Sequence, residues 1–250
     1  MTSDIISAPA GIQMAGRRHP LTHFGDCRKC VWMKRFLKQA LPCVAMLATA
    51  LCLAADDTET AAKTTVLVVG DSLSAGYGLR GEDSWVDLLQ ERLGSDYQVR
   101  NASVSGDTTG GGRARIGKTL ATHAPDIVII ELGGNDGLRG LPIETIRDNL
   151  TAMMEAVIAV EAKPVLAGML MPPNLGPRYT EAFQQVYEEV AEATGAALVP
   201  FLLEGVATSE EGLMQDDGVH PTAAAQGRLL DNVWTVLGPL VAKQQTGATR

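Results

Sequence analysis

The sequence predicts an α/β protein built as three layers, with helices covering both faces of a parallel five-stranded sheet. From Thr65 onward, short apolar runs rich in β-branched residues alternate with longer segments whose apolar residues recur every three or four positions. Continuous apolar runs are typical of strands that are buried on both faces, and the longer period is typical of amphipathic helices. This alternation favours a doubly covered, flavodoxin-like sheet.

Five segments carry the strand pattern, at residues 65–69, 97–101, 127–132, 164–170 and 196–199. Helical stripes lie between them and after the last one, and one of these helices is expected to start at Pro142, where the missing N–H costs nothing. The carboxyl ends of parallel strands share one rim of a sheet, which is where such folds build their sites. We therefore expect five polar clusters to meet at that rim: residues 70–74, 103–107, 133–136, 172–174 and 216–220.

The first 55 residues differ in composition from the rest, because they hold all four cysteines but only two of the 29 acidic residues. Within them, Met33-Lys34-Arg35 and the apolar run that ends at Ala55 have the anatomy of a secretory signal peptide. An uncleaved anchor is the alternative, but only about 13 residues of the run are cleanly apolar, fewer than the roughly 20 that span a bilayer. We therefore expect an over-extended or disordered leader at 1–32, a signal peptide at 33–55, one globular domain at 56–250, and a periplasmic or secreted product without a membrane span.

The domain expected at 56–250 is strongly acidic, with 14 basic and 27 acidic residues and a net charge of about −13. Such a charge disfavours nucleic acid as a partner. The domain contains no cysteine, and its histidines and carboxylates lack the spacing of zinc or calcium sites. The Cys27-x-x-Cys30 pair has no second pair to complete a metal site. We expect a monomer that needs neither metal nor cofactor.

Only two histidines, His123 and His220, remain to serve as a catalytic base in that domain. His123 is expected in a solvated loop at the opposite rim. His220 follows Asp217 by three residues, a spacing that lets the carboxylate bind Nδ1 and leaves Nε2 for a nucleophile. Ser72, two residues after a predicted strand and flanked by glycines, is the candidate nucleophile, although it also fits a structural helix cap.

Acyl transfer needs hydrogen-bond donors directed at the developing oxyanion. Gly106 offers a backbone N–H without a side chain in the way, and Asn135, after two glycines, offers its amide. Both residues are also common in ordinary turns.

These residues carry a resemblance to the GDSL, or SGNH, family of serine hydrolases. Gly70-Asp71-Ser72-Leu73 resembles the family's nucleophile block, and Asp217-Gly218-Val219-His220 resembles its Asp-x-x-His block. The order and separation of the blocks fit along residues 64–240. The longer strings GDSLSAGYG, GGNDGLRG and QDDGVHP are similar to those of the family's bacterial periplasmic thioesterases, which also act as lysophospholipases and arylesterases.

The resemblance implies the SGNH hydrolase fold and hydrolysis of a small-molecule acyl ester or thioester through an acyl-enzyme. It implies a catalytic triad of Ser72, Asp217 and His220, and an oxyanion hole formed by Ser72, Gly106 and Asn135. A carbohydrate or small-alcohol acetylesterase on the same fold is the alternative activity.

A second motif competes with this interpretation. Residues 112–119, Gly-Arg-Ala-Arg-Ile-Gly-Lys-Thr, match the phosphate-binding P-loop pattern. However, a P-loop leaves a strand directly, and about ten residues separate Asn101 from Gly112. A basic helix that covers the sheet is the better interpretation.

Apolar residues in two loops next to the predicted nucleophile indicate a shallow groove for an acyl chain, because loops rarely expose such side chains without a function. The expected groove residues are Leu138, Leu141, Pro173 and Leu175. For Leu138 and Leu141, packing against the next helix is the alternative.

Overall fold

The sheet consists of five parallel strands: β1 (Thr64–Gly70), β2 (Tyr97–Asn101), β3 (Ile127–Glu131), β4 (Lys163–Ala167) and β5 (Ala197–Val199). They lie in the order β2-β1-β3-β4-β5 in this computed structural model, which describes residues 63–81, 83–209 and 212–247. The predicted α/β fold and parallel five-stranded sheet are confirmed. The predicted leader and signal peptide lie outside the described residues, and the elements described here belong to the unit Ala61–Arg250.

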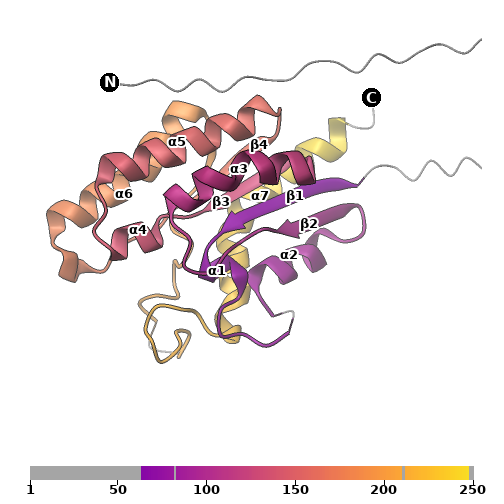
Figure 1. Cartoon of the computed structure of the whole chain (residues 1–250). Helices are drawn as coiled ribbons and strands as arrows, with labels where there is room; N and C mark the ends of the chain where they lie inside the picture. Colours follow the sequence, from indigo (N-terminus) through magenta and orange to yellow (C-terminus); the bar gives the residue numbers. More distant parts are fainter. Residues whose placement is uncertain (1–62, 82, 210–211, 248–250) are drawn as a thin grey trace, which may run out of the picture. The chain divides into compact units, whose positions relative to one another are not determined.

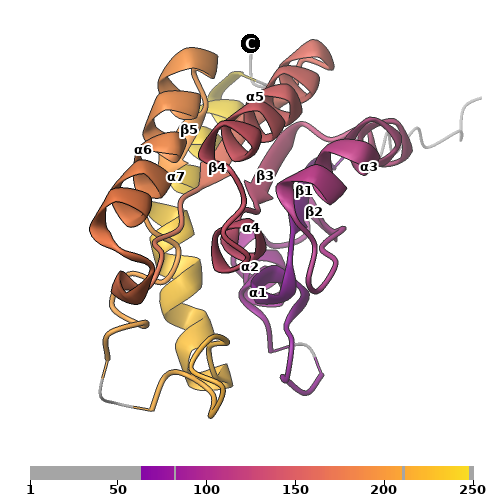
Figure 2. The same cartoon turned by 60° about the vertical axis from the view of Figure 1, so that its left-hand side comes forward.

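Helices cover both faces of the sheet (Figures 1 and 2). On one face α3 (Thr109–His123) packs on α5 (Ile143–Ala159), which packs on α6 (Pro177–Thr194). On the other face α2 (Trp85–Leu93) packs on α7 (Gln226–Gly247). Four short helical segments complete the fold: α1 (Ser72–Ala75), α4 (Gly134–Leu138), and the 3-10 turns η1 (Pro173–Leu175) and η2 (Ala223–Ala225). None of the helices in the described ranges is long and apolar enough to cross a bilayer.

The core lies between the sheet and its two helical layers. The central strands β1 and β3 are buried over Val66–Val69 and Ile127–Ile130, and the largest buried side chains of the layers are Trp85, Phe183 and Tyr187. Each such side chain contributes about 1.5–3 kcal/mol when it leaves water. This core makes β1 and β3 a rigid base for the residues that follow them.

Strand order reverses at β1, because β1 leads to β2 on one side while β3 lies on the other. In sheets of this kind a crevice opens beyond the carboxyl ends of the two strands that flank the reversal. The short helices α1 and α4 follow β1 and β3 directly. The residues that begin these helices therefore face each other across the crevice.

The strand bounds agree with the sequence prediction to within one residue, except at the end of the fourth strand. The fourth strand ends at Ala167 rather than at residue 170, because its pairing with β5 ends at Val199. Gly168 still donates to the carbonyl of Val199 at 2.8 Å, but the chain then leaves the sheet. His123 is the last residue of α3 rather than a loop residue, although it does lie at the rim opposite the polar clusters.

The structure contradicts the P-loop interpretation, because residues 112–119 lie wholly inside α3. The N–H of Gly112 already donates to the carbonyl of Thr108 at 2.9 Å, as in any helix, and is not available to a phosphate. A Cβ at this glycine would lie 2.3 Å from Cδ1 of Leu132. Gly112 therefore serves the close packing of α3 on the sheet.

Candidate active site

Ser72 begins α1 directly beyond the end of β1. Asp71 caps this short helix by accepting the N–H of Leu73 at 3.1 Å, and Gly76 ends it with a φ of 72°. Only glycine fits at position 70, since a Cβ there would lie 2.6 Å from Oε2 of the buried Glu131 and 2.7 Å from Oγ of Ser74. The sharp strand-to-helix turn thus holds Ser72, half-buried, at the rim of the sheet.

The structure brings Ser72, His220 and Asp217 together. Oγ of Ser72 lies 2.9 Å from Nε2 of His220, and Nδ1 of His220 lies 2.7 Å from Oδ2 of Asp217. The other oxygen of Asp217 accepts the N–H groups of Val219 and His220 at 2.9 and 3.0 Å. A local turn therefore fixes the carboxylate, which in turn favours the tautomer with a proton on Nδ1 and an acceptor at Nε2.

Hydrogen bonds, first among them that from His220, lower the pKa of Asp217 to about 2. A carboxyl group whose pKa is lower in the folded state than in the unfolded state stabilises the fold at pH values above its unfolded-state pKa. This stability is lost as the pH falls through the folded-state pKa. Asp217 therefore remains an anion, and an acceptor for His220, at any pH well above 2.

Sequence reasoning missed two residues that join the histidine loop to the nucleophile loop. Nε2 of Gln215 donates to the carbonyls of Tyr77 and Pro221, both at 2.9 Å. The ring of Tyr77 lies 4.4 Å from that of His220, tilted by 37°. Position 78 favours glycine, because its φ is 76° and a Cβ there would displace the amide of Gln215. In the sequence, Gln215 is the first residue of QDDGVHP, and nothing in that segment indicates its role.

Gly106 lies at a tight turn between β2 and α3. The N–H of Asp107 donates to the carbonyl of Val104 at 3.0 Å, and Gly106 adopts a φ of 78°, which glycine reaches without strain. The N–H of Val104 donates to the carbonyl of Gly70 at 3.0 Å, so the turn is fixed to the end of β1. Gly106 is exposed, and nothing lies within 4 Å of where its Cβ would be.

Asn135 approaches Ser72 from α4, on the other side of the crevice. Its Nδ2 donates to Oδ2 of Asp71 at 2.9 Å. An amide nitrogen carries two hydrogens, so one holds the side chain in place and the second is left for a bound acceptor. Of the three residues predicted for an oxyanion hole, Gly106 and Asn135 thus stand on either side of the loop that carries the third, Ser72.

A buried pair of carboxyl groups lies beneath Ser72. Burial raises the pKa of Asp71 to about 6, and burial together with the nearby Asp71 raises the pKa of Glu131 well above its usual value. Oε2 of Glu131 accepts from Oγ of Ser74 at 2.6 Å and from the N–H of Asp71 at 3.3 Å, whereas its Oε1 is buried without a partner. Two carboxylates this close repel each other, so ionising both groups is unfavourable.

An apolar groove of about 430 Å³ opens beside the nucleophile. Leu138 and Pro173 line it, as the sequence predicts, but Leu141 and Leu175 do not. Leu141 instead belongs to the turn into α5, where its carbonyl accepts from Oη of Tyr179 at 2.9 Å, and Leu175 lines a separate hollow between α5 and α6. Met169, in the second of the two predicted loops, also lines the groove. Apolar side chains that sequence reasoning missed complete it, among them Leu73, Phe201, Leu203, Met214 and Val219.

Within the described ranges, no three His, Cys, Asp or Glu side chains are grouped so that they could hold a metal ion. Ser72, His220 and Asp217 are instead arranged to move a proton from a hydroxyl to an imidazole. This geometry suits attack by a serine on a carbonyl carbon.

Comparison with known proteins identifies close relatives of the chain. It is 54% identical to esterase TesA of Pseudomonas aeruginosa over 187 residues, which cover 74% of this chain and 92% of that protein. It is 42% identical to thioesterase 1/protease 1/lysophospholipase L1 of Escherichia coli K12 over 181 residues, 72% of this chain and 86% of the relative. A crystal structure of TesA with 54% identity superposes with a TM-score of 0.69, covering 71% of this chain and 99% of that one.

The sequence profile of one family matches residues 68–228, which include Ser72, Gly106, Asn135, Asp217 and His220. This match spans more than half of the chain, and the relatives are aligned over most of their own length. The chain belongs to the GDSL-like lipase/acylhydrolase family.

Proposed function

We propose that this chain hydrolyses carboxylic esters and thioesters through an acyl-enzyme formed on Ser72. The observation that carries the proposal is the continuous arrangement of Ser72 Oγ, His220 and Asp217, with contacts of 2.9 and 2.7 Å. His220 takes the proton of Ser72 as the oxygen attacks the carbonyl carbon, and returns it to the departing alcohol or thiol. Water, activated by the same imidazole, then releases the acid and regenerates the serine.

The negative charge that develops on the carbonyl oxygen needs donors that are already in position. We assign this role to the N–H groups of Ser72 and Gly106 and to the second amide hydrogen of Asn135. Gly106 has no side chain to cover its N–H and lies at an exposed turn, and the bond from Asn135 to Asp71 limits the positions that the amide can adopt.

An acyl chain is the substrate portion that best suits the apolar groove. Leu73, the neighbour of the nucleophile, lines the groove together with Leu138, Pro173 and Phe201. The side chain of Leu138, which lines the groove, is 49% exposed, and a bound acyl chain would remove this apolar surface from water. The names of the two relatives, an esterase and a thioesterase with lysophospholipase activity, are consistent with acyl substrates.

We further propose that the mature enzyme acts in the periplasm or outside the cell, after cleavage of a signal peptide at residues 33–55. The basic start of that segment and its apolar run support this location. We expect it to need neither metal nor cofactor, because the proposed mechanism needs only protein groups. We also expect a monomer, since Ser72, His220 and Asp217 all come from one chain.

Covalent labelling tests the proposed nucleophile directly. A fluorophosphonate should react with Ser72 in the folded enzyme, because the triad activates this serine and a phosphonate is attacked in the same way as an ester carbonyl. Intact-mass measurement should find one adduct per chain, and peptide mapping should place it on Ser72. A soluble ester substrate should slow the labelling. An adduct on another serine, or none at all, would contradict the proposal.

A series of p-nitrophenyl esters and acyl-CoAs from two to sixteen carbons tests the groove. Each methylene that leaves water contributes up to ~0.8 kcal/mol, so kcat/KM should rise a few-fold per added carbon until the groove is full. Leu138→Asp should flatten this rise while changing acetyl ester hydrolysis little, and Leu175→Asp, outside the groove, is the matched control. A sharp optimum at acetyl would instead indicate an acetylesterase acting on carbohydrates or small alcohols.

A further inference from the structure

The two side donors of the proposed oxyanion hole come from different parts of the chain. Gly106 lies on the turn before α3, and Asn135 lies in α4, which follows β3. No single helix or strand therefore holds both donors at a set distance from each other. A contact between α3 and α4 close to both donors would set that distance.

Asp136 and Thr109 make that contact. Oδ1 of Asp136 accepts from Oγ1 of Thr109 at 2.6 Å, and Oδ2 accepts the N–H of the same threonine at 2.8 Å. Both residues are fully buried. Asp136 directly follows Asn135, and Thr109 follows Gly106 by three residues. A displacement at this contact would therefore also move the two donors.

Helix capping explains only one of these two bonds, the one that Oδ2 of Asp136 accepts from the N–H of Thr109. The first turn of α3 already has its own cap, Thr108, whose Oγ1 accepts the N–H of Gly111 at 3.2 Å. Asp136 binds the next residue instead, and its second bond is to a side chain rather than to the helix backbone. Behind it, Nδ2 of Asn149 donates to Oγ1 of Thr109 at 3.1 Å, which fixes the direction of the hydroxyl.

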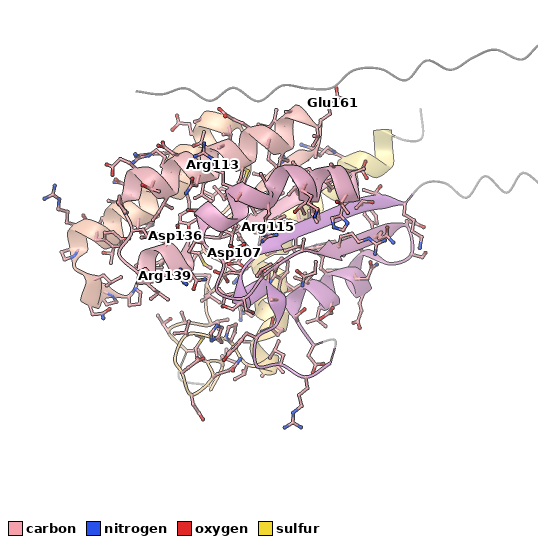
Figure 3. The ribbon with its side chains drawn as sticks, in the orientation of Figure 1. Asp107, Arg113, Arg115, Asp136, Arg139 and Glu161 are labelled. Atoms are coloured by element: carbon pink, nitrogen blue, oxygen red, sulfur yellow. The ribbon has the colours of Figure 1, made fainter. Side chains whose placement is uncertain are left out.

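Two arginines, Arg115 and Arg139, bind the same turn to its neighbours. Figure 3 labels both, together with Asp107 and Asp136. Nη2 of Arg139, just past α4, donates to the carbonyl of Gly106 at 3.2 Å. Arg115 of α3 bridges Asp107 at 2.8 Å, the carbonyl of Ala102 at 2.6 Å and that of Gly70 at 3.4 Å. The turn is thus held to β1 by Arg115 and to α4 by Asp136 and Arg139, and of these three side chains only Asp136 is fully buried.

We propose that Asp136 and Thr109 form a clasp that sets the distance between the Gly106 N–H and the Asn135 amide, so that Asp136 is a positioning residue for the oxyanion hole. This inference rests on the proposed function. The clasp acts on the transition state, where the oxyanion exists, and hardly on the bound substrate.

Kinetics of isosteric variants test the clasp. Because a small misplacement of a catalytic group costs up to about 10²-fold, we expect Asp136→Asn and Thr109→Val to lower kcat for p-nitrophenyl butyrate by roughly 10- to 100-fold with little change in KM. Thr109→Ser keeps the hydroxyl and should stay within about two-fold of the wild type. Asp126→Asn is the matched control, since Asp126 accepts the N–H of Thr65 at 2.7 Å at the opposite rim. Fluorophosphonate titration of active sites corrects each rate for misfolded protein.

A double-mutant cycle distinguishes positioning from general damage. Asn135→Ala alone should cost about 10²- to 10³-fold, as the loss of an oxyanion donor does. If Asp136 acts through Asn135, adding Asp136→Asn to that variant should lower kcat by less than about three-fold more, because the two changes share one interaction. Additive losses, or full activity in both clasp variants, would overturn the clasp. Wild-type activity in Asn135→Ala would overturn the proposed oxyanion hole itself.

Discussion

Ser72→Ala is expected to lower kcat/KM for p-nitrophenyl butyrate by about 10⁵- to 10⁶-fold, the loss seen when a hydrolase triad loses its nucleophile. The alanine removes the only atom that attacks the substrate. Within the part of the chain that the structure describes, the Ser72 hydroxyl makes one hydrogen bond, with Nε2 of His220, so the fold should be retained. Initial rates and circular dichroism, measured on the same preparation, test both statements.

The residues of a triad act as a unit, so a second change should add little. We expect His220→Ala to cost nearly as much as Ser72→Ala, and the double variant to be no worse than about three-fold below either one. His123→Ala is the matched control, because His123 ends α3 at the opposite rim. Multiplicative losses in the double variant, or a large loss in His123→Ala, would contradict the assignment of the base.

The fold follows from local patterns in the sequence. Buried parallel strands need continuous apolar runs, and the covering helices need apolar stripes. Both can therefore be predicted from the spacing of apolar residues in the sequence. The error at the fourth strand is informative, since Gly168, Met169 and Leu170 are as apolar as a strand. Their direction is set by where β5 ends and by the groove that Met169 lines, and a local pattern cannot contain either fact.

The sequence predicts those residues of the candidate site whose side chains can take part directly in the reaction. Ser72, Asp217 and His220 could be selected because few alternatives remain in the domain and because the carboxyl ends of parallel strands share a rim. Gln215, Arg115 and Asp136 support them through single long-range contacts. A polar residue that supports a site looks in sequence like any surface polar residue, so only the structure distinguishes it.

The groove shows the same limit in apolar residues. Leu138 and Leu141 are three positions apart, yet only the first lines the groove. Half of the groove comes from the long segment after β5, through Phe201, Leu203 and Met214. Its contribution depends on how the bridge between Met214 and Pro221 folds this segment back towards Ser72.

Asp217→Asn separates the two functions of the carboxylate, which are to hold the loop and to fix the histidine. The oxygen of an asparagine can still accept the N–H groups of Val219 and His220, which Oδ1 of Asp217 accepts at 2.9 and 3.0 Å. The loop should therefore keep its shape. The amide nitrogen, however, would donate to Nδ1 of His220, which would put the ring proton on Nε2 and leave no acceptor for the proton of Ser72.

We therefore expect Asp217→Asn to lower kcat by about 10³- to 10⁴-fold at neutral pH while KM changes little, since the wrong tautomer affects proton transfer rather than binding. Asp217 has a pKa of about 2, so the wild-type enzyme keeps this carboxylate ionised throughout a profile from pH 5 to 9. Asp216→Asn removes the same charge one residue away and is the matched control, for which we expect a change of less than about three-fold, as for an exposed charge. Equal losses in the two variants would mean that Asp217 acts only through its charge, and the orienting role would then be wrong.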